Sequence, residues 1–254
     1  MTMDATAPAG TLQAGRLRAG TLEAGGTMAR PLVIANPALG RRLRLILEIG
    51  LLFIAGPLLI KYGVFGLRLP LFVVLAPVFL TLLFYLLWDD TFQVVREAGR
   101  AFSWEEAGSI LGLFVGVGAI VTAFVSQRFP DEFLALPFNR PSLWAKIMLL
   151  YPVLSVVAQE LIYRTFFFHR YGPLFGRARW LLILTNAAVF GLAHILYGSW
   201  VSIILSALFG VLLAWRYDRT RSFWAVWVEH SLYGCLVFTI GLGRYFFTGV
   251  GNVG

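Results

Sequence analysis

Seven apolar stretches, each close to the length that crosses a lipid bilayer, constrain this chain more than any other feature. A spanning helix needs roughly 20 apolar residues, and the absence of water in the bilayer core requires its backbone groups to bond within the segment. Hydrophobic residues make up 59% of the 254 residues and charged residues only 13%. The sequence therefore predicts an all-α protein, a polytopic membrane helical bundle of about seven transmembrane helices. The stretches lie at about 45–67, 70–88, 107–127, 143–168, 180–197, 199–215 and 222–241.

The arginines gather in alternate links between these stretches. They precede the first stretch and follow the fourth and the sixth, at Arg16, Arg18, Arg30, Arg41, Arg42 and Arg44, then Arg170, Arg177 and Arg179, then Arg216, Arg219 and Arg221. Cytoplasmic loops carry an excess of Lys and Arg, which places the N-terminus inside and the C-terminus outside. We expect an integral protein of a bacterial cytoplasmic membrane, in contact with the lipid bilayer. Arginines in short loops form no continuous stripe, so the net charge of +8 does not indicate nucleic acid as a partner.

The N-terminal part has a different composition. Residues 1–42 begin with a low-complexity segment of Ala, Gly and Thr, in which A-G-T-L-Q-A-G is echoed as A-G-T-L-E-A-G. Such a segment buries too little apolar surface to order itself, so we expect a disordered cytoplasmic tail. Residues 43–141 are predicted to form the N-terminal transmembrane helices, 142–241 a functional core and 242–254 a C-terminal tail. Met1 and Met28 are both candidate translation starts.

Ionisable and polar side chains interrupt three of the apolar stretches. They are Gln159, Glu160 and Arg164 in the fourth, His194 near the end of the fifth, and Glu229 and His230 in the seventh. An ionisable group at membrane depth is expensive and marks a candidate functional site. The spacing of Glu160 and Arg164 puts both on one helical face, where they can pair. A carboxylate and neutral imidazoles around one cavity can activate a water, which predicts a hydrolase.

These residues also carry a resemblance to a known family. Residues 159–164 read Q-E-L-I-Y-R, 190–194 read F-G-L-A-H, and 230–234 run from His to Gly. The sequence here resembles the CPBP intramembrane endopeptidases, the family of the CAAX prenyl proteases and the bacteriocin-processing or immunity (Abi-like) proteins. Their pattern is E-E-x-x-x-R, F-x-x-x-H and H-x-x-x-N on successive core helices.

The resemblance covers about residues 142–241 and implies a four-helix catalytic core with endopeptidase activity. The implied substrate is a membrane-embedded or lipidated protein. The residues that match the family's catalytic positions, followed by two further contributors, are Glu160, Arg164, His194 and His230, then Gln159 and Glu229.

Two positions depart from the family pattern. Gln159 replaces the first Glu, to which the family's water-activating base is usually assigned, and Gly234 replaces an Asn that would help to stabilise an oxyanion. One hypothesis is that Glu160 takes the role of the base, with Arg164 orienting it. The other is a catalytically silent membrane scaffold or immunity protein. Adjacent helical residues point about 100° apart, so a transfer of the role from position 159 to 160 needs a rotated helix or a water on another side.

A metal site is the chemical alternative to a carboxylate-activated water. Two histidines and a glutamate would suit zinc. The sequence has no H-E-x-x-H helix, however, and Arg164 one turn from Glu160 would repel a dication. We therefore predict no metal ligands and no cofactor, and keep zinc as the alternative. A transporter is a different class again, but the chain shows no repeated inverted halves.

Overall fold

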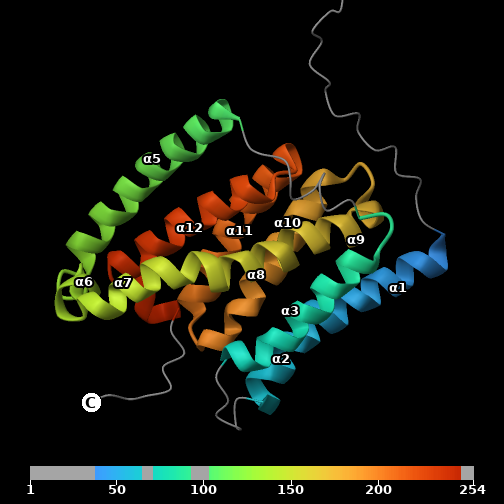
Figure 1. The fold of residues 1–254 in the computed structure, drawn as a ribbon, viewed down its shortest axis with the longest axis horizontal. Coiled ribbons are helices and arrows are strands. Elements are labelled where there is room, and N and C mark those ends of the chain that lie inside the picture. Colours follow the sequence, from blue (N-terminus) through green and yellow to red (C-terminus); the bar gives the residue numbers. More distant parts are fainter. Residues whose placement is uncertain (1–37, 65–70, 93–102, 247–254) are drawn as a thin grey trace, which may run out of the picture. The chain divides into compact units, whose positions relative to one another are not determined.

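The computed structural model describes residues 38–64, 71–92 and 103–246, which form helices and short links (Figure 1). The helices before the predicted functional core are α1 (Leu39–Ile49), α2 (Gly56–Leu59), α3 (Leu71–Trp88), α5 (Trp104–Arg128) and α6 (Ala135–Asn139). The part that follows holds α7 (Pro141–Leu150), α8 (Val157–Glu160), α9 (Phe167–Phe175), α10 (Arg179–Ala193), α11 (Trp200–Thr220) and α12 (Phe223–Thr239). The predicted disordered segment, apart from its last residues, and the last eight residues of the predicted tail lie outside the described residues.

Five helices in the described part of the chain are long and apolar enough to cross a membrane, which indicates an integral membrane protein. They are Leu39–Gly63, Trp104–Arg128, Pro141–Phe175, Arg179–Tyr197 and Trp200–Thr220. These five correspond to the first, third, fourth, fifth and sixth predicted stretches, and the described residues contain no strand. The all-helical membrane class is thus confirmed. The second and seventh stretches coincide with the shorter apolar helix Val74–Trp88 and with the 17-residue α12, so the total of seven spans stays a prediction.

The links between helices follow from local sequence. Ser103 and Glu106 form a capping box at the start of α5, in which each side chain bonds the other residue's backbone N–H. Gly198 takes a left-handed conformation (φ 71°) in the short turn from α10 to α11. These two helices pack very closely at Gly191, which has no side chain. A Cβ at this position would lie only 2.6 Å from the Cβ of Ala207. The close packing fixes the position of the end of α10, which carries His194.

An apolar and aromatic core holds the long helix Pro141–Phe175 against α11 and against the continuous helix Leu39–Gly63, which begins with α1. Phe53 makes edge-to-face contacts with Tyr163 and Phe167, at centroid distances of 5.5 and 5.2 Å. On the other side, Phe168 packs against Tyr217 at 5.2 Å. Phe167 and Tyr217 are fully buried. Aromatic pairs of this geometry contribute about 0.5–1.5 kcal/mol each beyond the burial of their area.

Ion pairs tie the end of this long helix to α1 and α3. Arg170 donates from Nη2 to Glu48 Oε1 (2.9 Å), from Nε to Glu48 Oε2 (3.1 Å) and from Nη1 to the Tyr85 hydroxyl (2.9 Å). Both carboxylate oxygens of Glu48 are thus committed to an arginine. Nearby, Asp89 lies 3.2 Å from His169 Nε2 and accepts from the Thr91 hydroxyl at 2.6 Å.

The contacts of Asp89 predict a pH-dependent contribution to stability. The hydrogen bond from Thr91 is the largest influence on this carboxyl group, and with His169 nearby it lowers the pKa of Asp89 to about 2. A depressed folded-state pKa stabilises the protein above the unfolded value of about 4, and the contribution is lost as the pH falls through about 2. We expect Asp89→Asn to destabilise the protein by roughly 1–2 kcal/mol at pH 7.

Thermal unfolding in detergent at pH 7 and at successively lower pH measures this effect. The difference from the wild type should shrink as the pH approaches 2. Asp90→Asn is the matched control, because the side chain of Asp90 is exposed, and it should unfold like the wild type at every pH. An equal destabilisation by both exchanges would contradict the assignment.

Candidate active site

The long helix changes its winding on both sides of Gln159 and Glu160. Residues 151–156 and 161–166 form wide π-helical turns, and α8 between them contains the two polar residues. Wide turns inside α-helices occur often at functional sites, because they redirect side chains. Here the two adjacent residues have different surroundings. Gln159 lines a cavity, whereas Glu160 is fully buried and is not part of the cavity wall.

The buried carboxylate of Glu160 contacts a histidine on another helix. Its Oε1 lies 2.7 Å from Nδ1 of His230 on α12. An ionised carboxylate only accepts hydrogen bonds, so this contact places the ring proton of neutral His230 on Nδ1. Nε2 is then an acceptor, and the hydroxyl of Tyr151 lies 3.1 Å from it, in position to donate. The network thus turns Nε2 of His230, the nitrogen that can take up a proton, toward Tyr151 and the cavity.

Arg164 is the charged partner of Glu160 on the same helix. Its Nε lies 3.4 Å from Glu160 Oε2, and both side chains are fully buried, which confirms the predicted pair four residues apart. Nη1 of Arg164 donates to Asn186 Oδ1 at 2.7 Å, and Asn186 in turn donates to the carbonyl of Tyr163. The guanidinium also lies over the ring of Phe190, 4.7 Å from its centroid. A carboxylate, an amide and an aromatic face therefore compensate for the burial of this cation.

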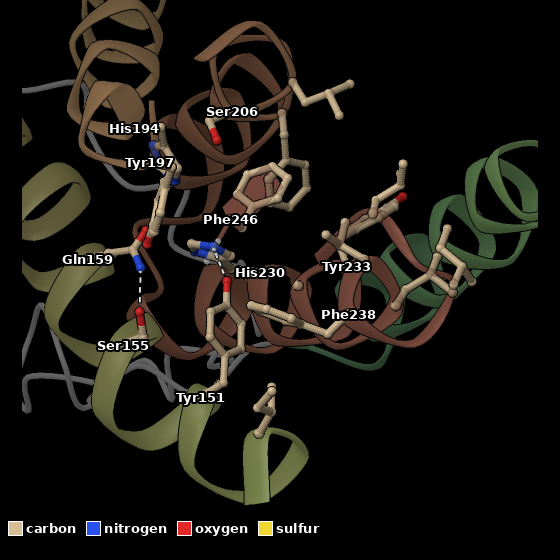
Figure 2. Close-up of a pocket in the computed structure, with 18 of the residues that line it drawn as sticks. Tyr151, Ser155, Gln159, His194, Tyr197, Ser206, His230, Tyr233, Phe238 and Phe246 are labelled. Carbon is tan, nitrogen blue, oxygen red and sulfur yellow. Dashed lines mark hydrogen bonds between the residues drawn. The ribbon is translucent and has the colours of Figure 1, made fainter. Parts of the chain in front are cut away.

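His230 lines a cavity of about 850 Å³, and Figure 2 shows several of the residues around it. Its wall is mostly apolar. Its polar lining includes Ser155, Gln159, His194, Ser206 and His230. Gln159 donates from Nε2 to the Ser155 hydroxyl at 2.7 Å, which fixes the orientation of the amide. A mostly apolar cavity with a few converging polar groups is the usual form of a binding site.

His194 is positioned by its own helix. Its Nδ1 lies 2.8 Å from the carbonyl oxygen of Phe190, an acceptor only, so this nitrogen carries the proton of the neutral ring. The ring of Phe190 contacts both imidazoles, with centroid distances of 4.9 Å to His194 and 5.7 Å to His230. The structure brings both histidines to the same cavity.

The remaining predicted contributor, Glu229, has a separate set of contacts. It forms a buried ion pair with Arg216, in which Arg216 Nη2 donates to Glu229 Oε1 at 2.8 Å and Nε donates to Oε2. Arg216 also reaches Ser109 on α5. Glu229 is not in the cavity wall. The contacts give Glu229 a role in joining α11 to α12, next to the site.

Tyr151 and Asn186 were not among the residues that sequence reasoning selected. A lone Asn within an apolar stretch is a signal that could have found Asn186, because a buried amide needs partners. The connection between Gly234 and Tyr151 cannot be seen in the sequence and becomes visible only in the structure. A Cβ at position 234 would lie 2.5 Å from the hydroxyl oxygen of Tyr151 and 2.6 Å from its Cζ. The ring of Tyr151 thus occupies the space that a side chain at position 234 would fill.

The residues do not fit a zinc site. Among the described residues, no group of three or more His, Cys, Asp or Glu side chains is arranged to hold a metal ion. The carboxylate of Glu160 is committed to His230 and Arg164, behind the cavity wall. We therefore derive no reaction step through a metal.

Comparison with known proteins bears on the same helices. Residues 141–236 match the family described as Type II CAAX prenyl endopeptidase Rce1-like. The matched segment begins with α7 and ends within α12, and it contains Gln159, Glu160, Arg164 and both cavity histidines. No curated protein and no solved structure matches the chain.

The fit between position 234 and Tyr151 yields a stability prediction. Gly234→Ala should destabilise the protein by about 1–3 kcal/mol, because the new methyl group overlaps the Tyr151 ring. In a Tyr151→Ala background the same exchange should be nearly neutral, which unfolding of the two single variants and the double variant measures. Gly116→Ala on α5 is the control, because nothing lies within 4 Å of its added Cβ. Additive effects of the two exchanges would contradict the steric fit.

Proposed function

Because residues 141–236 form a domain of the Rce1-like type II CAAX prenyl endopeptidase family, we propose that this protein is an intramembrane endopeptidase. It hydrolyses a peptide bond in a membrane-embedded or lipidated protein. The observation that carries the proposal is the buried contact between Glu160 and His230, which turns Nε2 of His230 toward a largely apolar cavity that His194 and Gln159 also line.

The geometry supports a mechanism in which the carboxylate acts through the imidazole. We had expected Glu160 to take a proton directly from a water held between it and His194. In the structure Glu160 is off the cavity wall, so we propose instead that the water transfers its proton to Nε2 of His230, after the Tyr151 hydroxyl has turned from that nitrogen toward the substrate. Glu160 accepts the Nδ1–H bond throughout and stabilises the imidazolium that forms. Arg164 supplies the opposite charge 3.4 Å from Oε2 of Glu160 and holds the carboxylate in place.

The other lining residues have complementary roles in this mechanism. His194 carries its proton on Nδ1, so its Nε2 can accept the second hydrogen of the water and orient it. The water oxygen attacks the scissile carbonyl carbon, and the carbonyl oxygen becomes an oxyanion. The donors for this oxyanion are the Tyr151 hydroxyl, once it has turned from His230, and the remaining N–H of the Gln159 amide. His230 then returns the proton to the leaving amine, which completes hydrolysis.

A second candidate function rests on Gln159. This neutral amide, and not Glu160, is the member of the pair that lines the cavity, and an amide cannot take up a proton from water. If the imidazole of His230 does not serve as the base, the chain is a catalytically silent membrane scaffold or immunity protein. That protein would bind a membrane partner without cleaving it.

Substitution of the two residues in the central contact tests the endopeptidase. With purified protein in detergent and a candidate membrane-protein substrate, Glu160→Gln and His230→Ala should each lower kcat by at least about 10²-fold. The reason is that His230→Ala removes the proton acceptor, whereas Glu160→Gln removes the carboxylate that orients it. Asp90→Asn, an exposed exchange at the end of α3, should retain the wild-type rate. Retention of wild-type kcat in both site variants, with their fold intact, would rule out this site.

The exchange Gln159→Glu separates the active from the silent alternative. If His230 is the base, the wild type cleaves, and Gln159→Glu lowers the rate, because a carboxylate replaces an N–H donor and adds a negative charge next to the oxyanion. If the wild type is silent, cleavage appears only in the Gln159→Glu variant. The comparison of the two rates on one substrate distinguishes these outcomes, and a gain in the variant would count against the proposed mechanism.

Chelation tests the zinc alternative. Under the proposed mechanism, cleavage by protein treated with a strong chelator and freed of metal should proceed at the untreated rate. Metal analysis of the same samples is the necessary companion measurement. A stoichiometric zinc ion that is lost together with activity, and restored with it, would replace this mechanism by a metal-dependent one.

A further inference from the structure

The arginines gather at one end of the helices, which we call the basic end. Contacts tie this end together. Arg170 bonds Glu48 on α1, Arg179 pairs with Asp218 on α11, and Arg216 reaches Ser109 near the start of α5. Within the described ranges, nine arginines lie here, namely Arg41, Arg42, Arg44, Arg170, Arg177, Arg179, Arg216, Arg219 and Arg221.

The opposite helix ends meet at what we call the distal end. Trp144 at the start of the long helix donates to Thr239 at the end of α12 (3.0 Å). Lys61 donates to the carbonyl of Ile195, just beyond α10 (2.6 Å). The ends of α5 and α12 share an apolar cluster that includes Val125 and Ile240. The basic residues of this end, within the described part, are fewer: Lys61, Arg128, Arg140, Lys146 and Arg244.

The cavity lies in the distal half of the bundle. Its wall takes residues from the first half of the long helix, the second half of α5 and the last turn of α10 with the residues just beyond it. From α12 and its C-terminal extension it takes His230 onward, and from α11 no residue beyond Leu212. Since the helices alternate in direction, these segments all lie toward the same end. None of the nine arginines of the basic end lines the cavity.

From this arrangement we infer that the cavity receives its substrate from the non-cytoplasmic side of the membrane. Lys and Arg are enriched in short cytoplasmic loops, so the basic end faces the cytoplasm. The cavity then opens toward the other side. The substrate class that fits is an apolar segment of an exported protein or of a membrane protein near its outer flank, not the tail of a cytoplasmic protein. This substrate class rests on the proposed function, whereas the side of access does not.

The charge at the cavity wall agrees with such a substrate. Lys146 is the lining residue with a permanent charge, and its side chain is exposed on α7 at the distal end. A membrane-protein substrate obeys the same charge rule and carries few Lys or Arg on its outer flank. Its approach from that side is not opposed by Lys146, whereas a basic cytoplasmic flank would be repelled.

Thiol labelling in intact cells tests the side of access without any need for activity. Cys235 is the sole cysteine, so a Cys235→Ala background is free of thiols. Single cysteines are introduced by Lys146→Cys at the distal end, by Ser206→Cys in the cavity wall and by Arg219→Cys at the basic end. Only those variants are used that reach the membrane and have the same unfolding temperature as the Cys235→Ala protein. The probe is a membrane-impermeant maleimide, applied before and after permeabilisation.

We expect positions 146 and 206 to react in intact cells and position 219 to react only after permeabilisation. Reaction of 219 in intact cells, with 146 protected, would overturn the orientation. Reaction of 146 from outside with 206 protected until permeabilisation would overturn the opening of the cavity to that side.

Cleavage of paired reporters then tests the substrate class. Two single-span reporter proteins carry the same cleavable segment, one on the non-cytoplasmic flank and one on the cytoplasmic flank. We expect cleavage of the first only, and cleavage of the second would overturn the inference. If a panel of such segments is cleaved on neither flank, the endopeptidase proposal and the substrate class that rests on it fail, while the labelling result still decides the side of access.

Discussion

The contact between the carboxylate of Glu160 and the imidazole of His230 is the interaction on which the rest of the site depends. Glu160 is fully buried among apolar helices that are long enough to cross a membrane, and an isolated charge there would cost several kcal/mol. The carboxylate is tolerated because Arg164 and His230 both face it. Arg164, equally buried, needs partners of its own, and Asn186 and Phe190 supply them. Removal of Arg164 or His230 takes one partner from the buried carboxylate, and removal of Glu160 takes one from both of them.

The same contact links packing to chemistry. It joins the long helix to α12 and so determines which nitrogen of His230 faces the cavity. The close approach of α10 and α11 at Gly191 brings His194 to the same cavity wall. Under the proposed mechanism the two imidazoles activate the water once the Tyr151 hydroxyl has turned from Nε2 of His230 to the substrate, so no carboxylate is needed in the cavity wall. This is how the chain can have Gln159 at the lining position and still support hydrolysis.

Much of the fold was predictable because the physics of the bilayer is local. The apolar length of a stretch and the need to satisfy its backbone identify a helix without knowledge of its neighbours. The pairing of Glu160 with Arg164 was predictable for the same reason, since positions four apart on a helix share a face. The partners of Glu229 and the role of Tyr151 were not, because they depend on which helices pack together. The different surroundings of Gln159 and Glu160 also escaped prediction, since the wide turns around residues 151–156 and 161–166 have no clear sequence signature.

The most direct test of this account is the protonation of the His230 ring. The chain has three histidines, so ¹⁵N NMR of protein labelled at histidine, with signals assigned by single His→Gln variants, can resolve each ring. The account predicts that neutral His230 in the wild type carries its proton on Nδ1 and leaves Nε2 unprotonated. A neutral His230 ring with its proton on Nε2 and none on Nδ1 would contradict it.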